Sequence, residues 1–177
     1  MAGYGIIGCG YAGGIHADNL AGLPGARLAA AFDLDYERSK AFVRDTGAYA
    51  APTIEELCSN REVEAVIITT PNNSHVTPAI LAAEAGKHVF CEKPVALSLK
   101  DTKEMLDAAE KAGGHFFAAH TTNFIRGVQT AKALLAAEEI GELLMIEAVH
   151  TDWAGPQKTI GWKQTKEISG GHLYHHM

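Results

Sequence analysis

A glycine-rich turn carries the first chemistry that the sequence suggests. Gly8, Gly10 and Gly13 follow the spacing G-x-G-x-x-G directly after an apolar run at Tyr4–Ile7 and before a helical stretch. In this pattern the first glycine permits a tight turn, the second lets the backbone approach a pyrophosphate, and the third brings the helix close to the strand. The free N–H groups of the helix N-terminus then favour phosphate. We therefore expect a dinucleotide to contact Gly8, Gly10, Tyr11, Ala12 and Gly13.

Asp33 extends this pattern. It follows the second apolar run, 20 residues after Gly13, where an acidic side chain binds the ribose hydroxyls of adenosine. A carboxylate there accepts hydrogen bonds from a free 2′-hydroxyl and repels a 2′-phosphate, so we expect NAD as the cofactor and NADP less. Arg38 lies close in sequence and would soften that preference. Two other interpretations stay open: a turn that only packs a strand on a helix, with Asp33 in solvent, and a methyltransferase that binds S-adenosylmethionine.

The elements that must position these residues alternate along the first 120 positions. Short apolar runs predict strands, and alanine-rich amphipathic stretches between them predict helices. The expected strands are Tyr4–Ile7, Leu28–Phe32, Ala65–Thr69, His88–Cys91 and His115–Ala119. The expected helices are Gly13–Ala21, Tyr36–Thr46, His75–Ala85 and Lys100–Lys111. This order predicts an α/β fold, a Rossmann-type doubly wound parallel sheet covered on both faces.

The pattern changes after residue 120. A helix is expected around Val128–Glu138 and a strand around Leu143–His150, but the regular alternation fails from Thr151 onward. A lone strand cannot satisfy its ladder hydrogen bonds without partners. We therefore expect these residues to begin a second domain that the 177 residues leave unfinished.

Composition narrows the function classes. With 47% hydrophobic and 20% charged residues in 177, the chain can bury a core, and its net charge of −6 argues against a nucleic-acid partner. Cys9, Cys58 and Cys91 are scattered without metal-ligand spacing, which suggests reduced thiols in a cytoplasmic protein. The sequence shows neither a secretory signal nor a membrane-spanning run. A small molecule is the partner we expect.

Two further motifs are more distinctive than the glycine turn. The first runs from Thr69 through Thr-Pro-Asn-Asn-Ser to His75, and the second from Glu84 to Glu92-Lys93-Pro94. With these motifs the chain resembles the Gfo/Idh/MocA oxidoreductases, the glucose–fructose oxidoreductase and inositol dehydrogenase group. The resemblance implies an NAD(P)-binding Rossmann domain at 1–120, followed by an α+β domain that holds the substrate site and forms homo-oligomer contacts. Residues 121–177 would be the incomplete N-terminal part of that domain.

The resemblance also assigns residues to the site. Thr70, Pro71 and Asn72 would line the dinucleotide, and Glu92 and Lys93 would lie near the nicotinamide, with a cis peptide before Pro94. His75, and His16 on the first helix, could face the cofactor, although helix capping and packing are common roles for such histidines. Glu92 either binds cofactor or Lys93, or is solvated.

Lys93 is the first candidate for catalysis. Oxidation of an alcohol needs a hydride acceptor and a group that takes the hydroxyl proton, and a neutral lysine amine can remove that proton. Burial beside a positively charged nicotinamide would lower the lysine pKa toward the working range. Without the flanking motif, a surface lysine would be the expected interpretation.

The histidine-rich end supplies the second candidate. A helix would place His172, His175 and His176 on one face, but no acidic or cysteine ligand neighbours them, so we predict no metal. The family usually has an Asp and a His after such a glycine-rich stretch, and this sequence departs from that pattern. We take His176 as a substrate-binding or acid–base residue and His175 as second choice, with a core or solvated role open. Trp162 would shape a pocket or pack in a core.

Together these features predict an NAD-dependent oxidoreductase that moves a hydride between a nicotinamide and a hydroxyl or carbonyl carbon of a sugar, polyol or related small molecule. We expect the 177 residues to keep the dinucleotide site without a finished substrate pocket. A non-catalytic dinucleotide-sensing module and an inactive fragment remain the alternatives.

Overall fold

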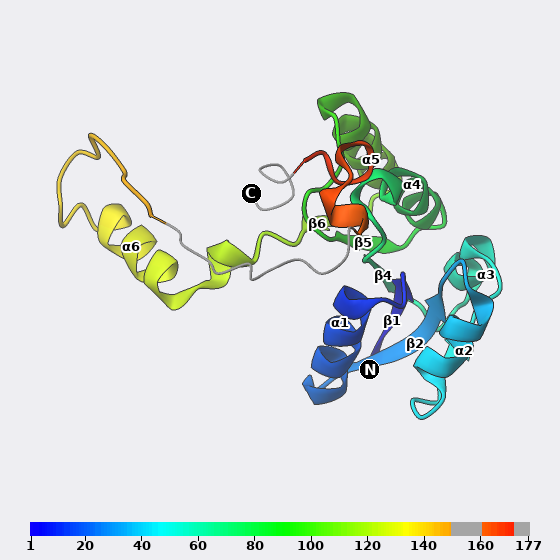
Figure 1. The fold of residues 1–177 in the computed structure, drawn as a ribbon. Coiled ribbons are helices and arrows are strands. Elements are labelled where there is room, and N and C mark those ends of the chain that lie inside the picture. Colours follow the sequence, from blue (N-terminus) through cyan, green and yellow to red (C-terminus); the bar gives the residue numbers. More distant parts are fainter. Residues whose placement is uncertain (150–160, 172–177) are drawn as a thin grey trace. The chain divides into compact units, whose positions relative to one another are not determined.

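The computed structural model describes residues 1–149 and 161–171 (Figure 1). By their contacts these residues form two units, the first made of residues 1–119 with 161–171 and the second of residues 120–149. The functional residues described below all belong to the first unit.

A six-stranded parallel sheet forms the centre of the first unit, in the order β3-β2-β1-β4-β5-β6. The strands are β1 (Ala2–Ile7), β2 (Ala26–Phe32), β3 (Tyr49–Ala50), β4 (Ala65–Ile68), β5 (His88–Cys91) and β6 (Phe116–Ala118). The chain order reverses between β1 and β4, and such a reversal leaves a crevice at the carboxyl ends of the strands. The expected Rossmann-type fold is therefore confirmed.

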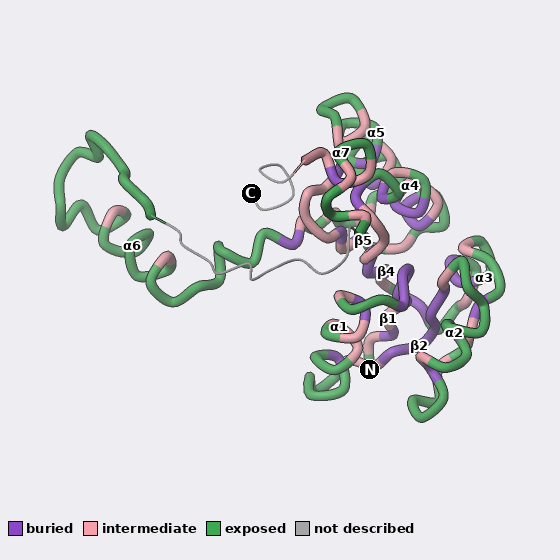
Figure 2. Tube along the Cα trace, viewed as in Figure 1, coloured by how far each residue is buried: buried purple, intermediate pink, exposed green. Residues whose placement is uncertain are grey.

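Helices cover both faces of this sheet. On one side, α1 (Tyr11–Gly22) and α2 (Tyr36–Val43) pack Leu20 and Val43 against Ile6 and Ile67. The opposite side carries α3 (Ile54–Ser59), α4 (Val76–Glu84) and α5 (Leu99–Lys111). There Leu57, Met105 and the alanines of α4 pack on Ile7 and Ile68. Neighbouring residues Ile6 and Ile7 thus point to opposite cores, as the period of a strand requires. In Figure 2 the buried residues follow the central strands.

Short polar side chains fix where several helices begin. Asp35, Thr53 and Ser98 each accept a hydrogen bond from the backbone N–H three residues later, which satisfies a donor that the first helical turn leaves open. The cap at Asp35 starts α2 directly after Asp33 and so brings Arg38 back toward that carboxylate.

The expected elements of the first unit are present with ends shifted by a few residues. The exceptions are β3 and α3, which the sequence did not lead us to expect. The strand β3 has only 2 residues, too few to show a strand pattern, and α3 has only 6 residues. Gly47, Gly86 and Gly113 follow α2, α4 and α5 with φ of 73°, 74° and 69°, as helix-ending glycines do.

In the second unit, η2 (Thr121–Phe124) precedes α6 (Arg126–Ala136), which lies close to the expected helix. The strand expected around Leu143–His150 is wrong for residues 143–149, which form no strand, and His150 lies outside the described residues. The physical reason is the absence of a partner strand. No described strand pairs with residues 143–149, so their backbone N–H and C=O groups form no interstrand hydrogen bonds within the described residues.

Residues 161–171 return to the first unit as η3 (Trp162–Gln164) and α7 (Lys166–Ser169). The buried Asn72 side chain donates a hydrogen bond from Nδ2 to the Ser169 carbonyl oxygen, at 2.8 Å, and Ser169 is fully buried. This contact joins positions 97 residues apart and fastens the segment beside the end of β4. Within the described residues, no helix has the length and apolar character needed to cross a membrane.

Candidate functional site

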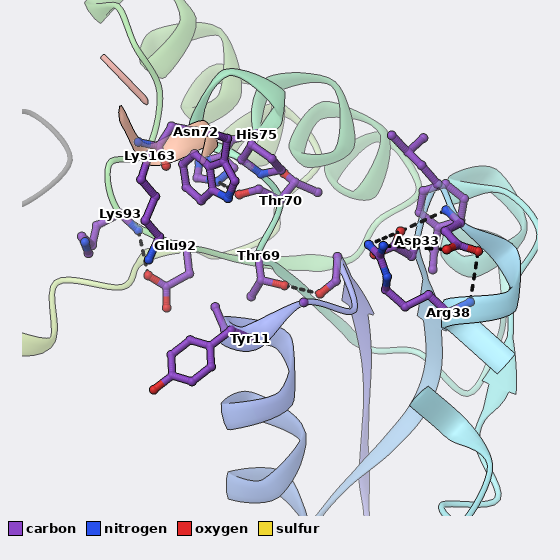
Figure 3. A pocket seen from close by; sticks show the side chains of 18 residues that line it. Tyr11, Asp33, Arg38, Thr69, Thr70, Asn72, His75, Glu92, Lys93 and Lys163 are labelled. Atoms are coloured by element: carbon purple, nitrogen blue, oxygen red, sulfur yellow. Dashed lines mark hydrogen bonds and ion pairs between the residues drawn. The ribbon is translucent and has the colours of Figure 1, made fainter. Parts of the chain in front are cut away.

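A cavity of about 630 Å³ lies where the carboxyl ends of β1, β2, β4 and β5 meet. Of the residues predicted to bind cofactor, all but Gly13 line it: Gly8, Gly10, Tyr11, Ala12, Asp33, Thr70, Pro71, Asn72, His75, Glu92 and Lys93. In Figure 3, Asp33 and Arg38 lie at one end of the cavity and Glu92, Lys93 and Lys163 at the other. The fold thus gathers residues from four separate motifs around one elongated space.

The glycine turn between β1 and α1 has the geometry that a phosphate cradle needs. Gly8 has φ of 105°, and a Cβ there would lie 2.9 Å from the Thr69 carbonyl carbon. A Cβ at Gly13 would overlap the Gly8 carbonyl oxygen. A Cβ at Gly10 would meet no atom within 4 Å, although Gly10 lines the cavity. The first and third glycines are therefore needed for packing, and the second leaves room for a ligand to approach the backbone, which fits a dinucleotide pyrophosphate.

Asp33 connects this turn to the far end of the cavity. Its Oδ2 accepts a hydrogen bond from the Cys9 backbone N–H at 2.9 Å, and its Oδ1 accepts one from the Asp35 backbone N–H at 3.0 Å. Arg38 Nη1 lies 3.3 Å from Oδ1 and 3.4 Å from Oδ2 (Figure 3). The carboxylate is thus fixed beside the glycine turn, and it forms an ion pair with the half-exposed guanidinium of Arg38. A carboxylate at this position can accept hydrogen bonds from the ribose hydroxyls of an adenosine.

At the opposite end, Glu92 and Lys93 directly follow β5, and the Lys93–Pro94 peptide bond is cis, as expected. The Lys93 backbone N–H donates to Glu92 Oε2 at 3.1 Å, and His16 Nε2 of α1 lies 2.9 Å from Glu92 Oε1. Burial alone would raise the pKa of Glu92, but the hydrogen bonds from His16 and Lys93 outweigh it, and the pKa falls below its usual value. Glu92 is therefore an ionised carboxylate at neutral pH.

Burial has the opposite effect on Lys93, because it disfavours a charged amine. The pKa of Lys93 is lowered chiefly by burial, the Glu92 carboxylate opposes this change, and the positive charge of Lys163 adds to it. An amine with a lowered pKa can lose and regain a proton near neutral pH more readily than a solvated lysine.

Two predicted residues have mainly internal contacts. His75 is fully buried, with Nε2 at 2.9 Å from the Thr70 carbonyl oxygen and Nδ1 at 3.0 Å from that of Pro94. It therefore ties the loop after β4 to the turn after β5. Asn72 is 2% exposed and holds Ser169, as described above. Both side chains shape the cavity wall as well as lining it.

Sequence reasoning missed two charged groups that line this cavity, Asp35 and Lys163. Lys163 lines the cavity, and its ammonium lies 5.8 Å from the centre of the Trp162 ring. Trp162, which had a pocket-shaping role among its expected alternatives, lines the cavity too. No local motif marks Lys163, because its place depends on the docking of residues 161–171. The catalytic candidate His176 and its alternative His175 lie outside the described residues. Within the part described, no cluster of three or more potential ligands could hold a metal ion.

One cavity therefore brings together a glycine turn with open space at Gly10, the Asp33 carboxylate, and the partly buried Lys93 amine at the end distant from that carboxylate. The residues present fit a nicotinamide dinucleotide by the open space at Gly10 and by the placement of Asp33.

Comparison with known proteins gives matches over both parts of the chain. The model of the oxidoreductase family with an NAD-binding Rossmann fold (GFO_IDH_MocA) matches residues 2–120, and that of its C-terminal alpha/beta domain matches residues 132–177. The chain is 41% identical over 175 residues to a 2,7-anhydro-N-acetylneuraminate hydratase of Mediterraneibacter gnavus. This match covers 99% of this chain and 46% of the relative. It is 34% identical over 155 residues to a myo-inositol 2-dehydrogenase of Thermotoga maritima, covering 86% and 46%.

Among solved structures, an NAD binding oxidoreductase from Klebsiella pneumoniae superposes with a TM-score of 0.81 at 31% identity, covering 98% of this chain and 49% of that one. The chain thus spans about half the length of the curated relatives it matches.

Proposed function

Because this chain belongs to the Gfo/Idh/MocA oxidoreductase family, whose N-terminal domain is an NAD-binding Rossmann fold, we propose that it supplies the cofactor site and the catalytic lysine of an NAD-dependent oxidoreductase. The reaction is hydride transfer between the nicotinamide and a hydroxyl or carbonyl carbon of a sugar, polyol or related small molecule. The observation that carries this proposal is the single cavity that Gly10, Asp33 and Lys93 line together. On this proposal residues 1–120 are the cofactor domain and residues 121–177 belong to the substrate domain.

The residues of this chain hold the dinucleotide by complementary chemistry. The backbone around Gly10 and the N-terminus of α1 bind the pyrophosphate, and Asp33 accepts hydrogen bonds from the adenosine ribose. Thr70, Pro71 and Asn72 form the wall between the ribose end and the nicotinamide end. When bound, NAD supplies the hydride acceptor that no amino-acid side chain provides.

Lys93 handles the proton. In the oxidising direction its neutral amine takes the proton from the substrate hydroxyl, and in the reducing direction its ammonium returns a proton to the carbonyl oxygen. Burial and Lys163 lower the pKa of Lys93, so a larger fraction of the amine is neutral than in a solvated lysine. His176 is proposed as a second acid–base or substrate-binding group, from its position in the sequence alone.

A second candidate reaction follows from the relatives. The match to a hydratase of an anhydro-sugar acid is stronger than the match to a myo-inositol dehydrogenase, at 41% against 34% identity and over more of the chain. A hydration leaves the oxidation state of the substrate unchanged, so a nicotinamide that takes part must return its hydride within the same cycle. Lys93 would serve either reaction as the proton-transfer group.

The test compares the wild-type protein with its Lys93→Ala variant. We expect turnover of 2,7-anhydro-N-acetylneuraminate or myo-inositol with NAD to fall roughly 10²–10⁴-fold, while NADH affinity changes less than about threefold. Net NADH formation marks the dehydrogenase, and product without net NADH marks the hydratase. Full turnover by Lys93→Ala would contradict the proposal, and so would absence of NADH binding by the folded wild-type chain.

A further inference from the structure

His16 lies in the middle of α1 and makes a contact that the proposed reaction does not yet use. Its Nε2 is 2.9 Å from Oε1 of Glu92, which is 76 residues away in sequence. The imidazole packs edge-on against the Phe90 ring, with centroids 5.2 Å apart and an interplanar angle of 72°. The His16 and Glu92 side chains are only 19% and 21% exposed. The contact is therefore held in place by packing, unlike an ion pair on an open surface.

The two oxygens of the Glu92 carboxylate have different donors. Oε1 faces His16, and Oε2 accepts the backbone N–H of Lys93. Neither of these donors is the Lys93 ammonium. The carboxylate is thus fixed on the α1 side of the cavity by two groups that orient it.

We propose that His16 is a positioning residue of this site: it holds the Glu92 carboxylate toward α1, and so limits how closely that negative charge approaches the Lys93 ammonium. The inference rests on the proposed function, because it concerns the protonation and position of the proposed catalytic amine. His16 itself touches neither substrate nor cofactor in this role.

The charged groups around Lys93 show why the position of one carboxylate matters. Among the described residues, Glu92 faces it from the end of the same strand and Lys163 from η3, while His16 on α1 acts through Glu92. Burial and Lys163 lower the pKa of Lys93, and Glu92 is the group that raises it. A carboxylate released by His16 is free to turn toward the ammonium, and an opposite charge at close range favours the charged form of the amine. Loss of the His16 contact should therefore keep Lys93 protonated to higher pH.

Two substitutions separate the hydrogen bond from the packing. His16→Phe keeps an aromatic ring against Phe90 but has no donor for Glu92. His16→Gln replaces the imidazole with an amide whose nitrogen can donate to the same oxygen. The Lys93 pKa is read from the side-chain NMR signal of isotope-labelled lysine, assigned by its loss in Lys93→Arg. This measurement uses the chain without cofactor or substrate.

We expect His16→Phe to raise the pKa of Lys93 by about one unit, and His16→Gln to restore the wild-type value. In the active protein the same shift should move the pH–rate profile of His16→Phe to higher pH, with NADH affinity unchanged. A Lys93 pKa that stays constant or falls in His16→Phe would overturn the inference.

A double-mutant comparison keeps the test decisive if His16→Phe is poorly folded. Glu92→Gln removes the charge through which His16 is proposed to act, so His16→Gln and His16→Ala should have equal Lys93 pKa values in that background. Unequal values would show that His16 acts by another route and would overturn the proposal. Failure of the proposed function looks different: Lys93→Ala would retain turnover, whatever His16 does to the Lys93 pKa.

Discussion

One methyl group added at different glycines of the phosphate turn should separate folding from cofactor binding. A Cβ at Gly10 meets no atom within 4 Å, and Gly10 has φ of −88°, which alanine adopts without strain. Because Gly10 lines the cavity, the added methyl group occupies space that the pyrophosphate needs. We expect Gly10→Ala to change the unfolding free energy by no more than about 0.5 kcal/mol and to weaken NADH binding about 10- to 100-fold, or about 1.4–2.8 kcal/mol.

Two neighbouring glycines provide controls for this experiment. A Cβ at Gly13 overlaps the Gly8 carbonyl oxygen, so Gly13→Ala must push α1 from β1 and should destabilise the fold by about 1–3 kcal/mol. A Cβ at Gly14 meets nothing within 4 Å, and Gly14→Ala should stabilise the chain by up to about 1 kcal/mol with unchanged NADH affinity. Urea unfolding followed by circular dichroism and calorimetric NADH titration give both quantities. Wild-type NADH affinity in Gly10→Ala would refute the reasoning.

Three further predictions follow from other contacts. Arg38 shares the Asp33 carboxylate, so Arg38→Ala should increase the preference for NADH over NADPH about tenfold, whereas Arg44→Ala should not; equal ratios in parallel titrations would refute this. The pKa of Glu92 is lowered on folding, so its stabilising contribution is complete above its unfolded pKa and is lost as pH falls through the folded value. Urea unfolding at pH 6 and pH 3 should therefore show a smaller loss of stability in Glu92→Gln than in wild type, and an equal loss would contradict the assignment. Burial raises the pKa of Cys9 and Cys91 to about 12 and that of Cys58 to about 11; a thiol reagent at pH 8 should modify all three rapidly only after unfolding, and fast reaction in the native state would be the contrary result.

The central elements could be predicted because their signals are local. The apolar run Val66–Ile68 has the composition of a buried parallel strand, and Ser98 with Asp101 marks the start of α5. The helix α3 was not expected, although it had such a signal: Thr53 is followed by Glu56 three residues later, and the structure shows that cap. The strand β3 had none, since two residues paired to β2 are defined by the sheet and not by their own sequence.

The residues of the site also differ in whether a sequence motif marks them. Asp33 was found through its spacing from the glycine turn, and Lys93 through the motifs that carry the family resemblance; the strand order brings both to one cavity. The contacts His16–Glu92 and Asn72–Ser169 span 76 and 97 residues. Such contacts depend on which strand ends meet at the sheet edge and on where residues 161–171 dock, so no short pattern could indicate them. Lys163 likewise lines the cavity because residues 161–171 dock beside it.

The most direct test of the central claim is a calorimetric titration of NADH into the folded chain. We predict saturable binding of one NADH per chain, weakened at least about tenfold by Asp33→Ala, which removes the hydrogen-bond acceptor for the ribose. The contradicting result is a chain that unfolds cooperatively, and is therefore folded, yet takes up neither NADH nor NADPH.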